Sequence, residues 1–110
     1  MTETTFDLTA LTAEFKQAMQ TLYGDRLLRV ILYGSYARGD FHEDSDVDFL
    51  IVLRGEEPKR MAEIERVHPV KSKLSTKYDI ELSAIAVPES RYLESDYLFF
   101  CNVRREGITL

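Results

Sequence analysis

The sequence predicts an α/β fold, a small mixed β-sheet flanked by helices, in a single domain that spans residues 1–110. Three observations lead to this prediction. The chain has 110 residues, which is the size of one domain. Two short, nearly continuous apolar runs, residues 27–33 and 47–53, have the composition of strands that are covered on both faces. Segments with apolar residues at helical spacing lie before and after them.

The first helix is predicted for residues 8–23, because leucine, phenylalanine and methionine recur there at helical spacing. Asp7 is the expected N-cap of this helix, and Gly24 is the expected stop. The two apolar runs follow as the first two strands. Residues 34–45, which are punctuated by glycines, form the connection between these strands.

The next helix is expected to begin near Pro58 and to keep one apolar face through about Tyr78. Pro69 interrupts this pattern, so we expect a kink or a restart of the helix there. A third strand is predicted for residues 79–87. Side chains alternate between the two faces of a strand, so Ile80 and Leu82 are expected in the core. The acidic residues of the same segment are expected on the opposite face.

The last part of the chain is predicted to be helical from Pro88-Glu89 onward and to stop at Gly107. Residues 108–110 then form a short edge strand. The aromatic residues of this region are expected to belong to the core or to an interface with a protein partner; they are Tyr97, Phe99 and Phe100.

Composition argues against several functional classes. The formal net charge is −5, whereas a protein that binds long nucleic acid alone usually has a basic surface. The longest apolar runs are far shorter than a membrane span. The first ten residues lack the basic-then-apolar order of a secretory signal. Cys101, the only cysteine, forms neither an internal disulfide nor a cysteine-based zinc site, so we expect a cytoplasmic protein.

The negative charge is concentrated in one segment. Five carboxylates lie within nine residues: Asp40, Glu43, Asp44, Asp46 and Asp48. Such side chains repel one another unless a cation lies among them. The segment is therefore either a solvated acidic loop or a metal site.

Gly34 and Ser35 lie where the first apolar run ends and a short helix could begin. Glycine allows backbone angles or a close approach that a side chain would prevent. Backbone N–H groups at a helix start attract anions, and the serine hydroxyl adds a further donor. The pair is either an ordinary turn or a site for a phosphate. Arg38, three residues later, can contact that phosphate or pair with Asp40 or Asp44.

Asp46 and Asp48 are two residues apart at the start of the second predicted strand, so their side chains project from the same face. Two like charges in a half-buried place require a cation or a strongly raised pKa. Carboxylate oxygens suit Mg²⁺, which usually takes its remaining ligands from substrate phosphates and water. The alternative is a polar strand end with both aspartates in water.

Together, Gly-Ser followed after ten residues by Asp-x-Asp resembles the signature of the DNA polymerase β-type nucleotidyltransferase superfamily. Residues 34–40 with residues 45–48 resemble its minimal nucleotidyltransferases, and the resemblance extends over nearly the whole chain. The resemblance implies the palm fold of that superfamily. It also implies an enzyme that uses ATP or another NTP and two Mg²⁺ ions.

The resemblance assigns roles to individual residues. Gly34 and Ser35 match the residues that hold the triphosphate, and Asp46 and Asp48 match the catalytic aspartates that bind the metal ions. The family usually adds a third carboxylate on a later strand. Glu81 is the expected third ligand, because it lies deeper in the third predicted strand than Asp79, which caps the strand or meets solvent.

Stand-alone domains of this type resemble the antitoxin partners of HEPN-domain RNases. The resemblance implies transfer of AMP from ATP to a hydroxyl, as AMPylation of a tyrosine on a partner HEPN toxin. A second hypothesis is a binding module that keeps the fold but has little catalytic activity, and that neutralises its partner by masking it.

Overall fold

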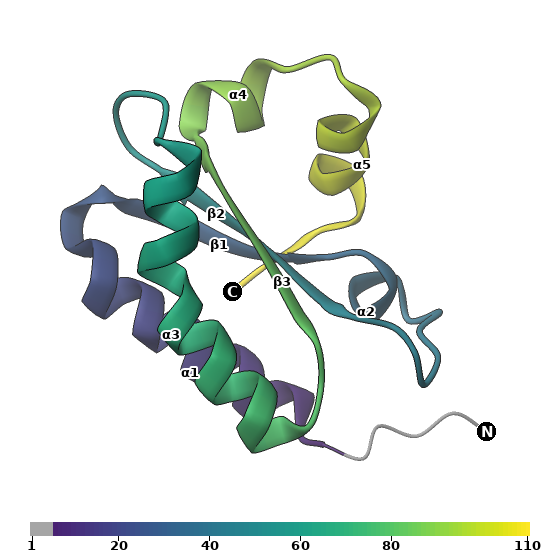
Figure 1. The fold of residues 1–110 in the computed structure, drawn as a ribbon. Helices are drawn as coiled ribbons and strands as arrows, with labels where there is room; N and C mark the ends of the chain where they lie inside the picture. Colours follow the sequence, from purple (N-terminus) through teal and green to yellow (C-terminus); the bar gives the residue numbers. More distant parts are fainter. Residues whose placement is uncertain (1–5) are drawn as a thin grey trace.

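The computed structural model describes residues 6–110. The prediction that the first ten residues form no secretory signal therefore falls partly, at residues 1–5, outside the described residues. Four strands form one mixed sheet in the order β3-β2-β1-β4 (Figure 1). The strands are β1 (Leu27–Tyr33), β2 (Val47–Leu53), β3 (Leu82–Pro88) and β4 (Ile108–Thr109). β1 runs antiparallel to β2 and β4, and β2 runs parallel to β3. The predicted small mixed sheet is confirmed.

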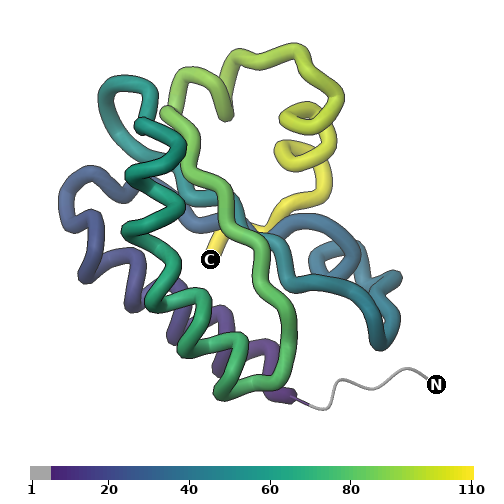
Figure 2. Tube along the Cα trace, viewed as in Figure 1, coloured from purple at the N-terminus to yellow at the C-terminus, as the bar shows by residue number. Residues whose placement is uncertain are grey.

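Helices cover both faces of this sheet. They are α1 (Leu8–Tyr23), the 3₁₀ turn η1 (Gly24–Arg26), α2 (Ser35–Arg38), α3 (Arg60–Tyr78), α4 (Glu89–Glu94) and α5 (Leu98–Glu106). α1 and α3 lie side by side on one face, and α4 and α5 lie on the other (Figure 1). After β3 the chain passes through α4 and α5 and returns to the edge of β1 as β4 (Figure 2). No helix in the described part of the chain combines the length and apolarity that a bilayer span requires.

The first helix forms as its capping residues and apolar spacing predict. The Asp7 carboxylate accepts a hydrogen bond from the N–H of Ala10 at 3.0 Å, and Gly24 ends the helix with a positive φ of 53°. Its buried face packs on β2, where the ring of Phe15 stacks on that of Phe49 with centroids 4.0 Å apart. This contact fixes α1 against the middle of the sheet.

Of the kink or restart predicted at Pro69, α3 shows no restart. The helix begins at Arg60, two residues after Pro58, and runs without a restart through Pro69 to Tyr78. Proline removes the hydrogen bond to the carbonyl four residues earlier. Here both Pro69 and Glu65 are exposed, so water can solvate that carbonyl. The expected restart is therefore wrong.

β3 also begins later than predicted. Asp79 has a φ of 52° and forms the left-handed C-cap of α3, with its N–H donating to the carbonyl of Ser75. The strand starts only at Leu82, because residues 79–81 serve to end the helix and reverse the chain. Ile80 and Leu82 nevertheless pack in the core as predicted.

Alternation along β2 divides the core into two clusters. Val47, Phe49, Ile51 and Leu53 face α1 and α3, whereas Leu50 and Val52 pack with residues of α4 and α5. Asp48 shares the face of Leu50 and Val52. The predicted acidic site therefore lies on the α4 and α5 side of the sheet.

Candidate active site

Gly34 joins the end of β1 to the start of α2. Its φ of 77° is unfavourable for residues with a side chain, and its carbonyl accepts hydrogen bonds from the N–H groups of Ala37 and Arg38, each at 3.1 Å. A Cβ atom at this position would collide with Oδ2 of Asp48. Glycine is thus required both for the turn and for the close approach of its backbone to a carboxylate of β2.

The first turn of α2 has unused hydrogen-bond donors. The N–H groups of Ser35 and Tyr36 and the hydroxyl of Ser35 have no partner within residues 6–110. Gly34, the N-cap, has no side chain to accept from them. These donors are therefore available to an anionic group beside Asp48.

The two aspartates interact electrostatically, as their spacing predicts. Asp46 is exposed and lies one residue before β2, whereas Asp48 is half-buried within the strand. Burial raises the pKa of Asp48, and the nearby charge of Asp46 raises it further, while Arg38 acts in the opposite direction. An added cation would relieve this repulsion, so the pair is suited to a hard metal ion.

Tyr33 is part of the site but was not singled out by the sequence. The register pairs Asp48 with Tyr33 on β1 and with Ser83 on β3, so the three residues form a row across the sheet. Burial and the charge of Asp48 raise the pKa of Tyr33 to about 12, against the effect of a hydrogen bond with Ser83. Tyr33 ends an almost wholly apolar run, so the sequence indicates a core residue. Only the pairing of the strands shows that it lies opposite Asp48.

Glu81 immediately precedes β3. Its carbonyl accepts a hydrogen bond from the N–H of Val47 at 3.0 Å, which aligns the starts of β2 and β3, and its side chain is exposed. Among residues 6–110, no three acidic, histidine or cysteine side chains gather closely enough to hold a metal ion together. The assignment of Glu81 as third metal ligand, with Asp79 as the alternative, stays a prediction.

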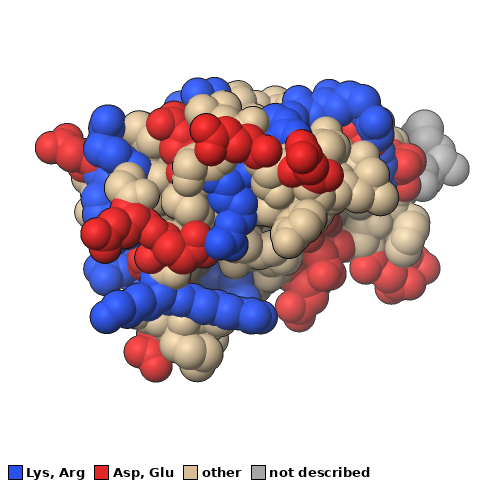
Figure 3. Space-filling model, turned by 90° about the horizontal axis from the view of Figure 1, so that it is seen from above, with Lys and Arg blue, Asp and Glu red and all other residues tan. Residues whose placement is uncertain are grey.

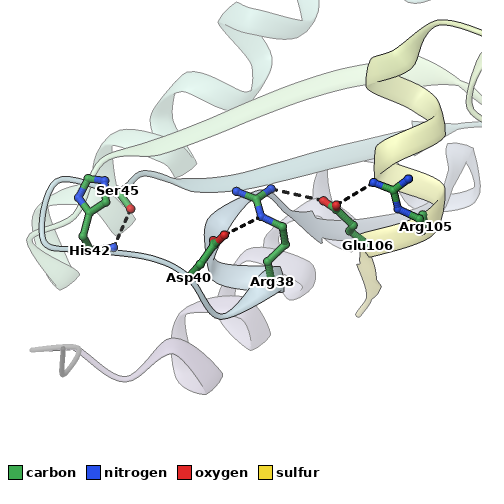
Figure 4. Close-up of polar contacts among 6 residues, drawn as sticks. All are labelled: Arg38, Asp40, His42, Ser45, Arg105 and Glu106. Atoms are coloured by element: carbon green, nitrogen blue, oxygen red, sulfur yellow. Dashed lines mark hydrogen bonds and ion pairs between the residues drawn. The ribbon is translucent and has the colours of Figure 1, made fainter. Parts of the chain in front are cut away.

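Arg38 connects the end of α2 to the end of α5 (Figure 4). Its Nε donates to Oδ2 of Asp40 at 3.1 Å, and one of its terminal nitrogens donates to Oε2 of Glu106 at 3.3 Å. Of the alternatives left open for Arg38, the pairing with Asp40 is confirmed. Asp44 is not its partner, because the loop that carries Asp44 folds on itself.

That loop is held by short-range hydrogen bonds around His42. The His42 N–H donates to Oγ of Ser45 at 2.9 Å (Figure 4). The Asp44 N–H donates to Nδ1 of His42 at 3.2 Å. His42 is thus a loop residue that shapes the approach to Asp46.

Asparagine at position 48 is expected to stabilise the ligand-free protein. A carboxyl with a raised folded-state pKa favours folding only at acidic pH, and this contribution is lost as the pH rises through that pKa. At neutral pH Asp48→Asn therefore removes a burial and repulsion cost, which predicts a gain of the order of 1 kcal/mol. Thermal denaturation without metal should show a higher Tm at pH 7 and a smaller difference near pH 4. A Tm that falls at pH 7 would contradict this account.

A family model, the nucleotidyltransferase domain, matches residues 13–97. Two similar proteins of Methanocaldococcus jannaschii bear the name "Putative protein adenylyltransferase". One, MJ0141, is 47% identical over 72 residues, which cover 66% of this chain and 71% of the relative. The other, MJ0604, is 37% identical over 98 residues, which cover 88% of this chain and 91% of the relative.

Solved structures show the same fold. A toxin-antitoxin with AMP-PNP superposes with a TM-score of 0.65 at 18% identity, covering 88% of this chain and 69% of that one. A "putative nucleotidyltransferase" from Sulfolobus solfataricus gives a TM-score of 0.63 at 21% identity, covering 91% of this chain and 76% of that one. A tri-AMPylated Shewanella oneidensis HEPN toxin in complex with an MNT antitoxin gives 0.51 at 18% identity, with 90% and 70% covered. The predicted fold is confirmed.

Proposed function

The chain belongs to the nucleotidyltransferase domain family, and from this membership we propose that it is a Mg²⁺-dependent enzyme that transfers AMP from ATP to a hydroxyl of a protein partner. In this proposal residues 1–110 act as one domain. The observation that carries it is the contact between the Gly34 turn and Asp48. This contact brings hydrogen-bond donors for a phosphate next to a candidate metal ligand.

The donor set fits divalent metal ions. Asp46 and Asp48 offer hard oxygen ligands, and their mutual repulsion is the kind that a bound cation removes. We propose that they hold two Mg²⁺ ions. Glu81, which is exposed just before β3, would become a third ligand by turning its side chain toward the pair when metal binds. When bound, the ions would neutralise the triphosphate and promote loss of the acceptor proton.

The residues of the chain would hold the nucleotide in the following way. The N–H groups of Ser35 and Tyr36 and the Ser35 hydroxyl donate to phosphate oxygens. Tyr33 stays protonated at neutral pH because its pKa is raised to about 12, so it can donate a hydrogen bond but cannot act as a base. The acceptor oxygen forms a bond to the α-phosphorus, the bond to the β-phosphate oxygen breaks, and pyrophosphate leaves while the acceptor loses its proton.

A protein acceptor is supported by exposed apolar side chains at the start of α5. Tyr97 and Leu98 are 76% and 74% exposed, whereas Phe100 belongs to the core. Phe99 connects this surface to the site, because its ring contacts that of Tyr33 edge-on with centroids 5.4 Å apart. On the face seen in Figure 3, acidic and basic side chains are interspersed.

We propose that the partner is a HEPN-type RNase toxin and that the chain acts as its antitoxin. Structural neighbours that include a HEPN toxin with its MNT antitoxin support this assignment. A tyrosine hydroxyl, with a free pKa of about 10, becomes a nucleophile once its proton is removed. The AMP phosphate would place negative charge beside the RNase site and repel RNA.

The experiment combines the purified chain, the product of its neighbouring gene, labelled ATP and Mg²⁺, followed by mass spectrometry to locate the label. We expect label on a tyrosine of the partner, and none when EDTA is present. If no label is transferred and the partner is still neutralised, the masking module replaces the enzyme as the better explanation.

Ser35→Ala is expected to weaken binding of Mg²⁺·ATP about tenfold. The substitution removes one hydroxyl donor to a charged phosphate, which is typically worth about 1.5 kcal/mol. The fold should persist, because Ser35 makes no side-chain hydrogen bond within the described residues. Calorimetric titration with a non-hydrolysable ATP analogue measures the effect, with Ser90→Ala on α4 as the control. Equal affinities for both variants would show that the Ser35 hydroxyl donates no hydrogen bond to the phosphates.

A further inference from the structure

The last residue of α5 reaches back to the turn of the candidate active site. Glu106 accepts a hydrogen bond from Arg38 at 3.3 Å, although the two residues are 68 positions apart (Figure 4). The Glu106 side chain is 26% exposed, whereas Asp40, the other carboxylate on Arg38, is 63% exposed. Of the two carboxylates, Glu106 is the better shielded from water.

Glu106 is held in position by its surroundings. Arg105 donates to its other carboxylate oxygen at 3.0 Å. At Gly107 a Cβ would approach Cγ2 of Ile31 and the carbonyl of Val103 to 2.6 Å, so the backbone here lies directly on β1. A carboxylate at a helix C-terminus is electrostatically unfavourable. Its presence there needs a compensating interaction, and Arg38 supplies one.

Arg38 and Glu106 together form part of a pocket wall. An open pocket of about 300 Å³ lies between α2 and α5. Its lining includes Tyr33, Gly34 and Arg38 on one side and Phe99, Asn102 and Glu106 on the other. The pocket therefore begins at the proposed phosphate turn and continues along α5.

The guanidinium of Arg38 keeps donors for a ligand. Its Nε donates to Asp40 and Nη1 donates to Glu106, but Nη2 has no partner within the described residues. The charge of Arg38 already acts on the site, because it lowers the pKa of Asp48 against the larger effects of burial and Asp46. A guanidinium fixed by two carboxylates loses little further freedom when it binds a phosphate.

We propose that Glu106 is a positioning residue for nucleotide binding: it holds Arg38 at the wall of the α2 and α5 pocket, where Nη2 of Arg38 donates to the terminal phosphates of the NTP. This inference rests on the proposed function. It extends the site to the carboxyl-terminal helix, from which the sequence predicted no site residue.

The test is a double-mutant cycle on the full chain, with the Kd of a non-hydrolysable Mg²⁺·ATP analogue as the readout. Glu106→Ala and Arg38→Ala should each weaken binding about tenfold, as loss of a supporting partner typically does. The double variant should bind no more weakly than Arg38→Ala alone, because Glu106 acts through Arg38. Glu106→Gln, which keeps an acceptor oxygen, should recover part of the affinity.

Glu94→Ala, which removes an exposed carboxylate from α4, serves as the control for the change in net charge. Additive effects in the double variant, or a Glu106→Ala affinity within twofold of the parent, would overturn the inference. Thermal denaturation of each variant checks folding, and Glu106→Gln supplies the comparison if Glu106→Ala is unfolded. Suppose that the parent binds the analogue, that Asp48→Asn does not, and that Glu106→Ala binds normally. The positioning role of Glu106 is then wrong, while the proposed function stands. If the parent binds no nucleotide, the proposed function fails with it.

Discussion

The Asp46→Asn/Asp48→Asn variant is expected to lose AMP transfer by at least about 1,000-fold while it remains folded. Two carboxylates that repel each other at the start of β2 are replaced by neutral amides, which are poor ligands for Mg²⁺. A loss of this size corresponds to about 4 kcal/mol of transition-state stabilisation, within the range expected for metal ions at a phosphoryl centre. Label transfer from ATP under single-turnover conditions measures the rate, and thermal denaturation checks the fold.

The matched control is Glu43→Gln/Asp44→Asn, which removes two charges from the same acidic segment. Both residues are exposed and form no ion pair within residues 6–110. We expect this variant to transfer AMP at nearly the parental rate. If the two double variants lose activity equally, the effect comes from net charge, and the assignment of Asp46 and Asp48 as metal ligands would be withdrawn.

Gly34→Ala is expected to abolish detectable nucleotide binding and to destabilise the fold by about 2 kcal/mol or more. A side chain at a φ of 77° costs about 1–3 kcal/mol by itself. The new Cβ would also collide with Oδ2 of Asp48, so either β2 or the turn must move. Denaturant unfolding and nucleotide titration measure the two effects separately.

Gly39→Ala is the matched control for backbone strain. Gly39 also has a positive φ, 86°, but a Cβ there would meet no atom within 4 Å. This variant should lose less stability than Gly34→Ala, because Gly39 has left-handed helical angles that other residues can adopt, whereas the angles of Gly34 are nearly restricted to glycine. It should keep most of its nucleotide affinity. Comparable loss of binding in both variants would show that the collision with Asp48 is not the cause.

Local sequence patterns determined most of the secondary structure. The bounds of β1 and β2 were predicted correctly, because each is an apolar run that polar residues or glycine interrupt at its end. The limits of α1 were also correct, since Asp7 and Gly24 act on their immediate neighbours. The start of β3 was predicted wrongly, because Asp79 takes a left-handed conformation that ends α3. The alternation of apolar and polar residues in that segment does not indicate this conformation.

The sequence by itself also determined the family and the two motifs, Gly34-Ser35 and Asp46-x-Asp48, because both depend on spacing within one short segment. Only the tertiary structure decided which other residues meet them. Tyr33 lies opposite Asp48 through strand register, and Glu106 reaches Arg38 because α5 folds back over the sheet. The spacing of apolar residues and the capping of helices determine local structure over a few residues. The neighbours of a side chain across strands or between distant helices depend instead on how the whole core packs.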